Sequence, residues 1–213
     1  PTGPHPQLSV NAVIGGEDRA TVLRAAAAAQ SAGYQVLKLK LGTRALSEEL
    51  NLVEALLGQG TDVLQLRLDV NGGWTEHQAA QAIAELNAWP IESLEQPLPA
   101  SLLGAMARIR EQARFVLAAD EAMLGPGALE RIITLRAADR VVLKPAALGG
   151  LRSSWRLAAR ARAAGLQVLV TSFIDSSVGV HAACHLAAAL PVELPACGLA
   201  TGGLLSRDLS APL

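Results

Sequence analysis

The chain has 213 residues, of which 51% are hydrophobic, 17% charged and 3% aromatic, and its formal net charge is −1. This composition is typical of a globular protein with a large aliphatic core. The sequence contains no basic patch, and no apolar run approaches the roughly 20 residues that span a bilayer, so we expect neither nucleic acid nor a membrane as a partner. The length fits one domain over residues 1–213.

The N-terminus and the two cysteines together favour a cytoplasmic location. Residues 1–6 contain neither a basic segment nor an apolar run, so no signal peptide is visible. Cys184 and Cys197 lie in apolar surroundings without a paired C-x-x-C spacing. We expect both to be reduced core residues, and a bridge between them is the alternative.

The predicted elements begin with a strand over residues 8–14 that ends in a Gly-Gly turn. Asp18 is then expected to cap a helix that runs to about Ser31, with Gly33 as its stop signal. Five short apolar runs follow, and each ends in a charged residue. They cover residues 37–40, 66–69, 91–95, 116–120 and 141–144. A repeat of about 25 residues accommodates one strand, one helix and two short loops.

The segments between these strands have helical periodicity, as in residues 76–87 and 151–164. Two more strands are predicted, over residues 167–172 and near residues 192–195, which gives eight strands and seven intervening helices. Strands that are apolar on both faces and alternate with helices indicate a parallel sheet. We therefore predict an α/β fold, a modified TIM-type (β/α)7β barrel of parallel strands. No glycine-rich phosphate motif follows the first strand, which argues against a dinucleotide or nucleoside triphosphate site.

Carboxylates end three neighbouring predicted strands. Asp69, Glu95 and Asp120 each follow a buried apolar run, and the carboxyl ends of parallel strands meet at the mouth of such a barrel. Oxygen donors with room for water and substrate suit a hard divalent cation, so the pattern predicts an Mg²⁺ site, with Mn²⁺ as the alternative. The competing interpretation is that each acid is a helix cap or a surface charge. Asn71 is expected to support the metal or bind a substrate oxygen, or else to serve only its turn.

Three lysines complete this pattern. Lys38 and Lys40 are two residues apart on one strand and therefore face the same side, while Lys144 enters from the sixth strand across the mouth. A lysine crowded by other cations loses its proton more easily, and a neutral amine can act as a base. We interpret all three as catalytic candidates. The alternative for a K-x-K motif is an exposed edge strand.

The order of these motifs resembles the enolase superfamily, in particular its muconate-lactonizing-enzyme-like group. The matching motifs are Leu37-Lys38-Leu39-Lys40, Leu68-Asp69-Val70-Asn71, Leu94-Glu95-Gln96-Pro97, Ala119-Asp120-Glu121 and Leu143-Lys144-Pro145. The resemblance extends from Val10 to about Leu209. Within the group, further segments are similar to the o-succinylbenzoate synthase family, and they cover residues 9–12, 95–99, 171–179 and 198–202.

This resemblance implies a reaction that begins with removal of the proton alpha to a carboxylate in a small-molecule substrate. Lys40 would be the general base, and Mg²⁺ on the three carboxylates would stabilise the enediolate intermediate. In a lyase of the o-succinylbenzoate synthase type, which serves menaquinone or phylloquinone biosynthesis, syn loss of water would follow. Lys38 would hold the substrate carboxylate, and Lys144 would stabilise the intermediate from the opposite face.

Relatives in the same superfamily share these residues but catalyse other reactions. N-succinylamino acid racemases and dipeptide epimerases use the equivalents of Lys40 and Lys144 as two acid/base partners, so this alternative stays open. Ser172 and Ser176 follow the seventh predicted strand and are expected to bind the distal group of the substrate. The His181 and His185 pair has helical spacing, and we interpret it as ordinary helix histidines without a metal.

Members of this superfamily carry an N-terminal capping domain that closes over the substrate. The chain begins at the first barrel strand, so we expect that domain to be missing, and an uncapped barrel excludes water poorly. A separate capping segment or a homo-oligomer is the expected partner for the uncovered surface. The hypothesis from another class is a non-catalytic, truncated barrel scaffold.

Overall fold

The computed structural model describes residues 7–58 and 65–210 of the chain. Seven parallel strands pair in chain order into one curved sheet. The strands are β1 (Ala12–Ile14), β2 (Val36–Lys40), β3 (Gln65–Asp69), β4 (Ile91–Glu95), β5 (Val116–Ala119), β6 (Arg140–Leu143) and β7 (Gln167–Val170). The predicted α/β barrel of parallel strands is confirmed.

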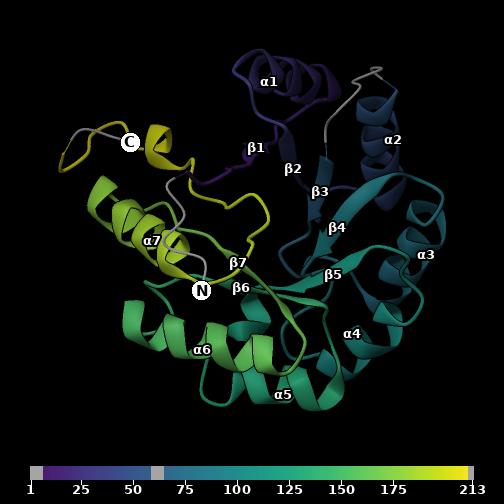
Figure 1. Cartoon of the computed structure of the whole chain (residues 1–213). Helices are drawn as coiled ribbons and strands as arrows, with labels where there is room; N and C mark the ends of the chain where they lie inside the picture. The colour runs from purple at the N-terminus through teal and green to yellow at the C-terminus, as the bar shows by residue number, and fades with distance from the viewer. Residues whose placement is uncertain (1–6, 59–64, 211–213) are drawn as a thin grey trace.

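Seven α-helices surround the outer face of this sheet (Figure 1). They are α1 (Arg19–Ser31), α2 (Leu46–Leu57), α3 (Glu76–Leu86), α4 (Leu103–Arg110), α5 (Ala128–Leu135), α6 (Leu151–Ala163) and α7 (Ser177–Ala189), and the 3-10 helices are η1 (Glu121–Met123) and η2 (Gly202–Leu204). Within residues 7–58 and 65–210, none of these helices has both the length and the apolar character that a membrane crossing needs.

Local signals explain where the predicted helices begin. The Asp18 carboxylate accepts a hydrogen bond of 2.7 Å from the Thr21 N–H at the start of α1. A capping box between Thr75 and Gln78 begins α3. Both satisfy N–H groups that have no partner inside the first helical turn.

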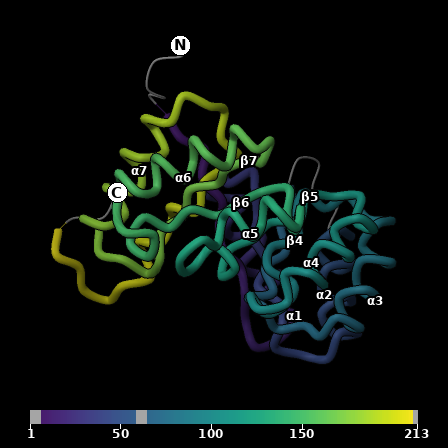
Figure 2. Tube along the Cα trace, turned by 90° about the horizontal axis from the view of Figure 1, so that it is seen from below, coloured from purple at the N-terminus to yellow at the C-terminus, as the bar shows by residue number. Residues whose placement is uncertain are grey.

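The barrel is closed by a very short segment after α7. Cys197 pairs with Val10, and Gly198 pairs with Thr171 at the end of β7. Seen from below, the purple start of the chain lies against the yellow-green segments near its end (Figure 2). These two residues take the place of the eighth strand. Both cysteines are free thiols, as expected.

The predicted eighth strand near residues 192–195 is wrong, because these residues form no strand in the structure. Pro191 precedes this segment and Pro195 is its last residue, and proline has no N–H to donate to a sheet. The closing contacts are instead made by Cys197 and Gly198. The backbone N–H of Cys197 donates to the Ser9 carbonyl at 2.7 Å, and that of Gly198 donates to the Val170 carbonyl at 3.1 Å.

The two faces of the sheet are filled differently. The main hydrophobic core packs between sheet and helices and includes Leu39, Leu68 and Leu117, all fully buried. A separate cluster of Ala118, Val142 and Leu169 alternates with these positions and lies inside the barrel. The rest of the interior is largely polar and includes the buried side chains of Lys38, Arg67, Asp69, Ser93, Glu95 and Arg140.

The floor of the barrel is held by one carboxylate between two guanidinium groups. Glu92 accepts from Arg67 at 2.8 Å and from both terminal nitrogens of Arg140. Burial alone raises the pKa of Glu92, but the arginines outweigh it and lower the pKa from 4.5 to about 2. Arg67 and Glu92 therefore have a structural role at the end of the barrel opposite its mouth.

Glu92→Gln is expected to destabilise the fold by about 3 kcal/mol at pH 7, because it leaves two buried guanidinium groups without a counter-charge. Denaturant unfolding of both proteins measures this difference. Glu92 is ionised in both folded and unfolded chains above pH 4.5, so its contribution is complete there. It should fade as the pH falls from 4.5 to about 2.

Glu76→Gln is the matched control, because Glu76 pairs with Arg108 on the surface, where both side chains are about half exposed. That variant should lose less than about 1 kcal/mol. Equal losses in the two variants would show that the floor network does not stabilise the barrel more than a surface ion pair.

Candidate active site

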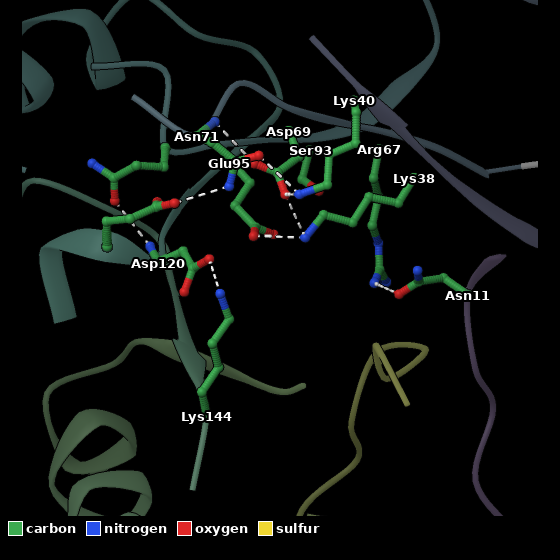
Figure 3. Close-up of polar contacts among 12 residues, drawn as sticks. Asn11, Lys38, Lys40, Arg67, Asp69, Asn71, Ser93, Glu95, Asp120 and Lys144 are labelled. Atoms are coloured by element: carbon green, nitrogen blue, oxygen red, sulfur yellow. Dashed lines mark hydrogen bonds and ion pairs between the residues drawn. The ribbon is translucent and has the colours of Figure 1, made fainter. Parts of the chain in front are cut away.

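The backbone register brings the predicted site residues together at the carboxyl ends of the strands. Lys40 is the direct partner of Asp69 across β2 and β3, and Asp69 is the partner of Glu95 across β3 and β4. Asp120 and Lys144 stand one residue beyond β5 and β6. The mouth of the barrel therefore holds six charged side chains from five consecutive strands (Figure 3).

Each lysine contacts a carboxylate. The Lys38 Nζ lies 2.8 Å from Asp69 Oδ2 and 2.7 Å from Glu95 Oε1, while the Lys40 Nζ lies 2.7 Å from Asp69 Oδ2. Lys144 forms an ion pair with Asp120. These three are the only lysines in the chain, which otherwise uses arginine for positive charge.

The lysines differ in how far solvent reaches them. The side chain of Lys40 is 42% exposed, whereas those of Lys38 and Lys144 are 9% and 18% exposed. Figure 3 shows Lys144 approaching the carboxylates from below, while Lys38 and Lys40 approach from the right. The mouth thus presents one accessible amine and one more enclosed amine on two sides of the acids.

The ion pairs control the charges of the buried groups. Burial alone lowers the pKa of Lys38, but attraction to Glu95 and Asp69 outweighs it and raises the pKa above its usual value. Burial raises the pKa of Asp69, but Lys38 and Lys40 outweigh it and lower that pKa. Lys38 therefore stays a cation and Asp69 an anion.

Glu95 behaves differently from Asp69. Burial raises its pKa to about 7, Lys38 opposes this effect, and the charges of Asp69 and Asp120 add to it. Three buried carboxylates thus repel one another across the mouth. A further positive charge beside these carboxylates would reduce their mutual repulsion.

The donor set suits a hard divalent cation, since it consists of carboxylate oxygens on adjacent strands. In the arrangement described, these oxygens face ammonium groups instead. Among residues 7–58 and 65–210, no three Asp, Glu, His or Cys side chains converge as a ready-made metal site. A cation and the lysines would therefore compete for the same oxygens.

The remaining candidates follow the carboxyl ends of β3 and β7. The Asn71 side chain lies between Lys40 and Glu121, and its backbone has the left-handed φ of 49° expected of its turn. The Ser172 hydroxyl is buried against Thr201, at 2.8 Å. Ser176 is the N-cap residue of α7 but makes no capping hydrogen bond through its side chain.

His181 makes a hydrogen-bond contact within its own helix. Its Nδ1 lies 2.7 Å from the Ser177 carbonyl, one turn earlier in α7.

Lys144 also contacts an aromatic ring, since its Nζ lies 4.9 Å from the centre of the Phe173 ring. In such a cation–π contact the ammonium group is attracted to the face of the ring.

Sequence reasoning missed two residues that shape the mouth. Gln96 is fully buried, and its side-chain oxygen accepts from the N–H groups of Asp120 and Ala122, both at 3.0 Å. Glu49 is also fully buried, and one of its oxygens accepts from three successive N–H groups over residues 42–44. Gln96 thereby fixes the turn at Asp120, and Glu49 fixes the loop after Lys40.

Two glycines allow the loops after β2 and β3 to touch. A Cβ on Gly42, which has a φ of 89°, would lie 2.3 Å from the Val70 carbonyl oxygen. A Cβ on Gly73 would lie 2.5 Å from the Gly42 carbonyl oxygen. Only glycine permits this backbone contact beside Lys40 and Asp69.

Curated enzymes are similar in sequence to this chain. It is 41% identical over 166 residues to an o-succinylbenzoate synthase of Mycobacterium ulcerans. The aligned residues make up 78% of this chain and 47% of the relative. The chain is 34% identical over 173 residues to a chloromuconate cycloisomerase of Cupriavidus necator, with 81% and 47% covered. The chain thus spans about half the length of these relatives.

Solved structures are also similar to this chain in fold and in sequence. An N-succinyl Arg/Lys racemase from Bacillus cereus superposes with a TM-score of 0.90 at 30% identity, over 96% of this chain and 55% of that one. Residues 21–211 match the family described as "Enolase C-terminal domain-like". That match covers most of the chain and agrees with the barrel and the charges at its strand ends. The chain therefore belongs to the enolase C-terminal domain-like family.

Proposed function

We propose that the protein is a lyase of the o-succinylbenzoate synthase type, acting in menaquinone or phylloquinone biosynthesis on a small-molecule carboxylate. The observation that carries this proposal is the placement of one accessible amine, Lys40, beside three buried carboxylates at the mouth of the barrel. The 41% identity to a synthase supports the choice among reactions of the family.

In the proposed reaction, Lys40 takes the proton alpha to the substrate carboxylate. Lys38, which stays protonated, pairs with that carboxylate and offsets the charge that develops on it. Lys40 then gives its proton to the departing hydroxyl. The C–H and C–O bonds break on the same face, a C=C bond forms, and water leaves.

Asp69, Glu95 and Asp120 would hold Mg²⁺, or Mn²⁺ in its place. When bound, this ion supplies positive charge against the substrate carboxylate. Lys144, held by Asp120 and Phe173, would place a second cation on the other side of the substrate. Ser172 and Ser176, which follow β7 in the chain, would contact the distal group of the substrate.

A second candidate reaction is racemisation of N-succinylamino acids or epimerisation of dipeptides. The observation that favours it is the approach of Lys40 and Lys144 from two sides of the carboxylates (Figure 3). Two amines on opposite faces can remove a proton on one face and return it on the other. The 30% identity to a racemase also supports this candidate.

Exchange of the substrate alpha-proton in deuterated water tests the step shared by both reactions. We expect Mg²⁺-dependent exchange with the wild-type chain and a loss of about 10³-fold or more in Lys40→Met, because the proton acceptor is removed. Mass spectrometry of the recovered substrate measures the rate. Assays should include both the cyclohexadiene precursor of o-succinylbenzoate and the two enantiomers of an N-succinylamino acid.

Lys144→Met distinguishes the two candidates. A two-base racemase should lose exchange of one enantiomer in Lys40→Met and of the other enantiomer in Lys144→Met. A synthase should form product from the precursor and show no such division. Absence of exchange in the wild-type chain with every substrate would contradict both, and would favour the non-catalytic scaffold.

Metal binding is testable apart from turnover. Asp120→Asn should weaken Mg²⁺ binding at least about tenfold, because it replaces an anionic ligand by a neutral one. Titration calorimetry and the rise in melting temperature with Mg²⁺ measure the change. Asp139→Asn is the matched control, since Asp139 pairs with Arg110 away from the mouth. Equal effects in both variants would argue against the proposed ligand.

A further inference from the structure

A continuous line of hydrogen bonds runs from Lys40 to a carboxylate outside the proposed metal ligands. Lys40 Nζ donates to Asn71 Oδ1 at 2.8 Å, and Asn71 Nδ2 donates to Glu121 Oε1 at 2.9 Å (Figure 3). Lys40 also donates to Asp69 Oδ2 at 2.7 Å. Asn71 therefore bridges the accessible amine and Glu121.

The chemistry of these groups permits only one orientation of the Asn71 amide. The Lys40 ammonium has donors and no acceptor, whereas an ionised Glu121 has acceptors and no donor. A flipped amide would place its NH₂ group against the ammonium and its oxygen against the carboxylate. The hydrogen bond to Glu121 thus orients the Asn71 amide with its oxygen toward Lys40.

The middle of the line, Asn71, and its far end, Glu121, are both held by hydrogen bonds of the backbone. Asn71 has a φ of 49°, and its own N–H donates to Asp69 Oδ1 at 3.1 Å, which holds the residue in its turn. Glu121 begins η1, and Gln96 accepts from the N–H groups on either side of it. The second carboxylate oxygen of Glu121 is buried without a hydrogen-bond partner among the described residues.

Two of the three hydrogen-bond directions of Lys40 are therefore occupied by Asp69 and Asn71. An ammonium group has three donors, so one direction stays available for substrate. When the amine is neutral, two N–H groups keep these contacts and the lone pair occupies the third direction. The two acceptors would thus orient the lone pair of Lys40 toward the direction that is available for substrate.

We propose that Glu121 is a positioning residue that acts through Asn71 to orient the Lys40 amine. This role rests on the proposed function in so far as Lys40 is the base. The hydrogen-bond line itself consists only of side chains of this protein. It can therefore be tested on the metal-free chain, whether or not the chain turns over substrate.

The rate at which a water-soluble acylating reagent modifies Lys40 reports how firmly its amine is held. Lys38, Lys40 and Lys144 are the only side-chain amines present, so peptide mass spectrometry can follow each of them. Glu121→Met should raise the rate at Lys40 about fivefold, because the freed Asn71 amide no longer holds the amine. Glu121→Gln should stay within about twofold of wild type, since its amide oxygen can still accept from Asn71.

Glu85→Met is the matched control, because it makes the same Glu-to-Met substitution on the exposed face of α3. It should leave the labelling rates of all three lysines unchanged. A second readout is the ¹H–¹⁵N signal of the Asn71 side chain, assigned by its loss in Asn71→Ala. This signal should move in Glu121→Met and change much less in Glu121→Gln.

A wild-type labelling rate at Lys40 in a folded Glu121→Met protein would overturn the proposal. A parallel rise at Lys38, Lys40 and Lys144 would also overturn it, because that result indicates general loosening of the mouth. Absence of proton exchange in the wild-type chain would contradict the proposed function alone. The labelling result would stand, and the role would then be limited to orienting Lys40.

Discussion

The arrangement of the barrel mouth depends on the ion pairs that Lys38 makes with the buried carboxylates of Asp69 and Glu95. A charge moved from water into a protein interior costs several kcal/mol unless it is paired and hydrogen-bonded. Parallel pairing places Asp69 directly opposite Glu95, whereas Lys38 is paired with Arg67, two residues before Asp69, and its side chain reaches both carboxylates. The sheet register thus creates the charge cluster, and the lysine makes its burial tolerable.

The two ends of the barrel use similar pairing for different purposes. At the floor, Glu92 is enclosed by Arg67 and Arg140, and the pairing joins β3, β4 and β6. At the mouth, the acids outnumber the fully buried cations, and Lys40 is substantially exposed. An enclosed network stabilises a fold. An accessible amine beside mutually repelling carboxylates can also exchange its partners for a substrate or a cation, which is why chemistry is expected at this end.

Sequence patterns predicted most of the fold because strand and helix periodicities alternate clearly, and because charges end five successive apolar runs. The eighth strand was misplaced since residues 192–195 have the hydrophobicity of a strand, whereas closure is made by backbone groups of Cys197 and Gly198. Glu49 and Gln96 escaped prediction for a related reason. Most of their partners are main-chain groups, and no pattern of side chains marks such contacts.

The sequence alone determined which kinds of groups stand at the strand ends, because side-chain periodicity and strand polarity are local properties. It could also determine that Lys38 and Lys40 share a face. Only the tertiary structure decided that Lys38 stays protonated, that Lys40 remains accessible, and that Asn71 lies between Lys40 and Glu121. Charge state, exposure and amide orientation depend on burial and on atoms far apart in the chain, and these are set when the barrel closes.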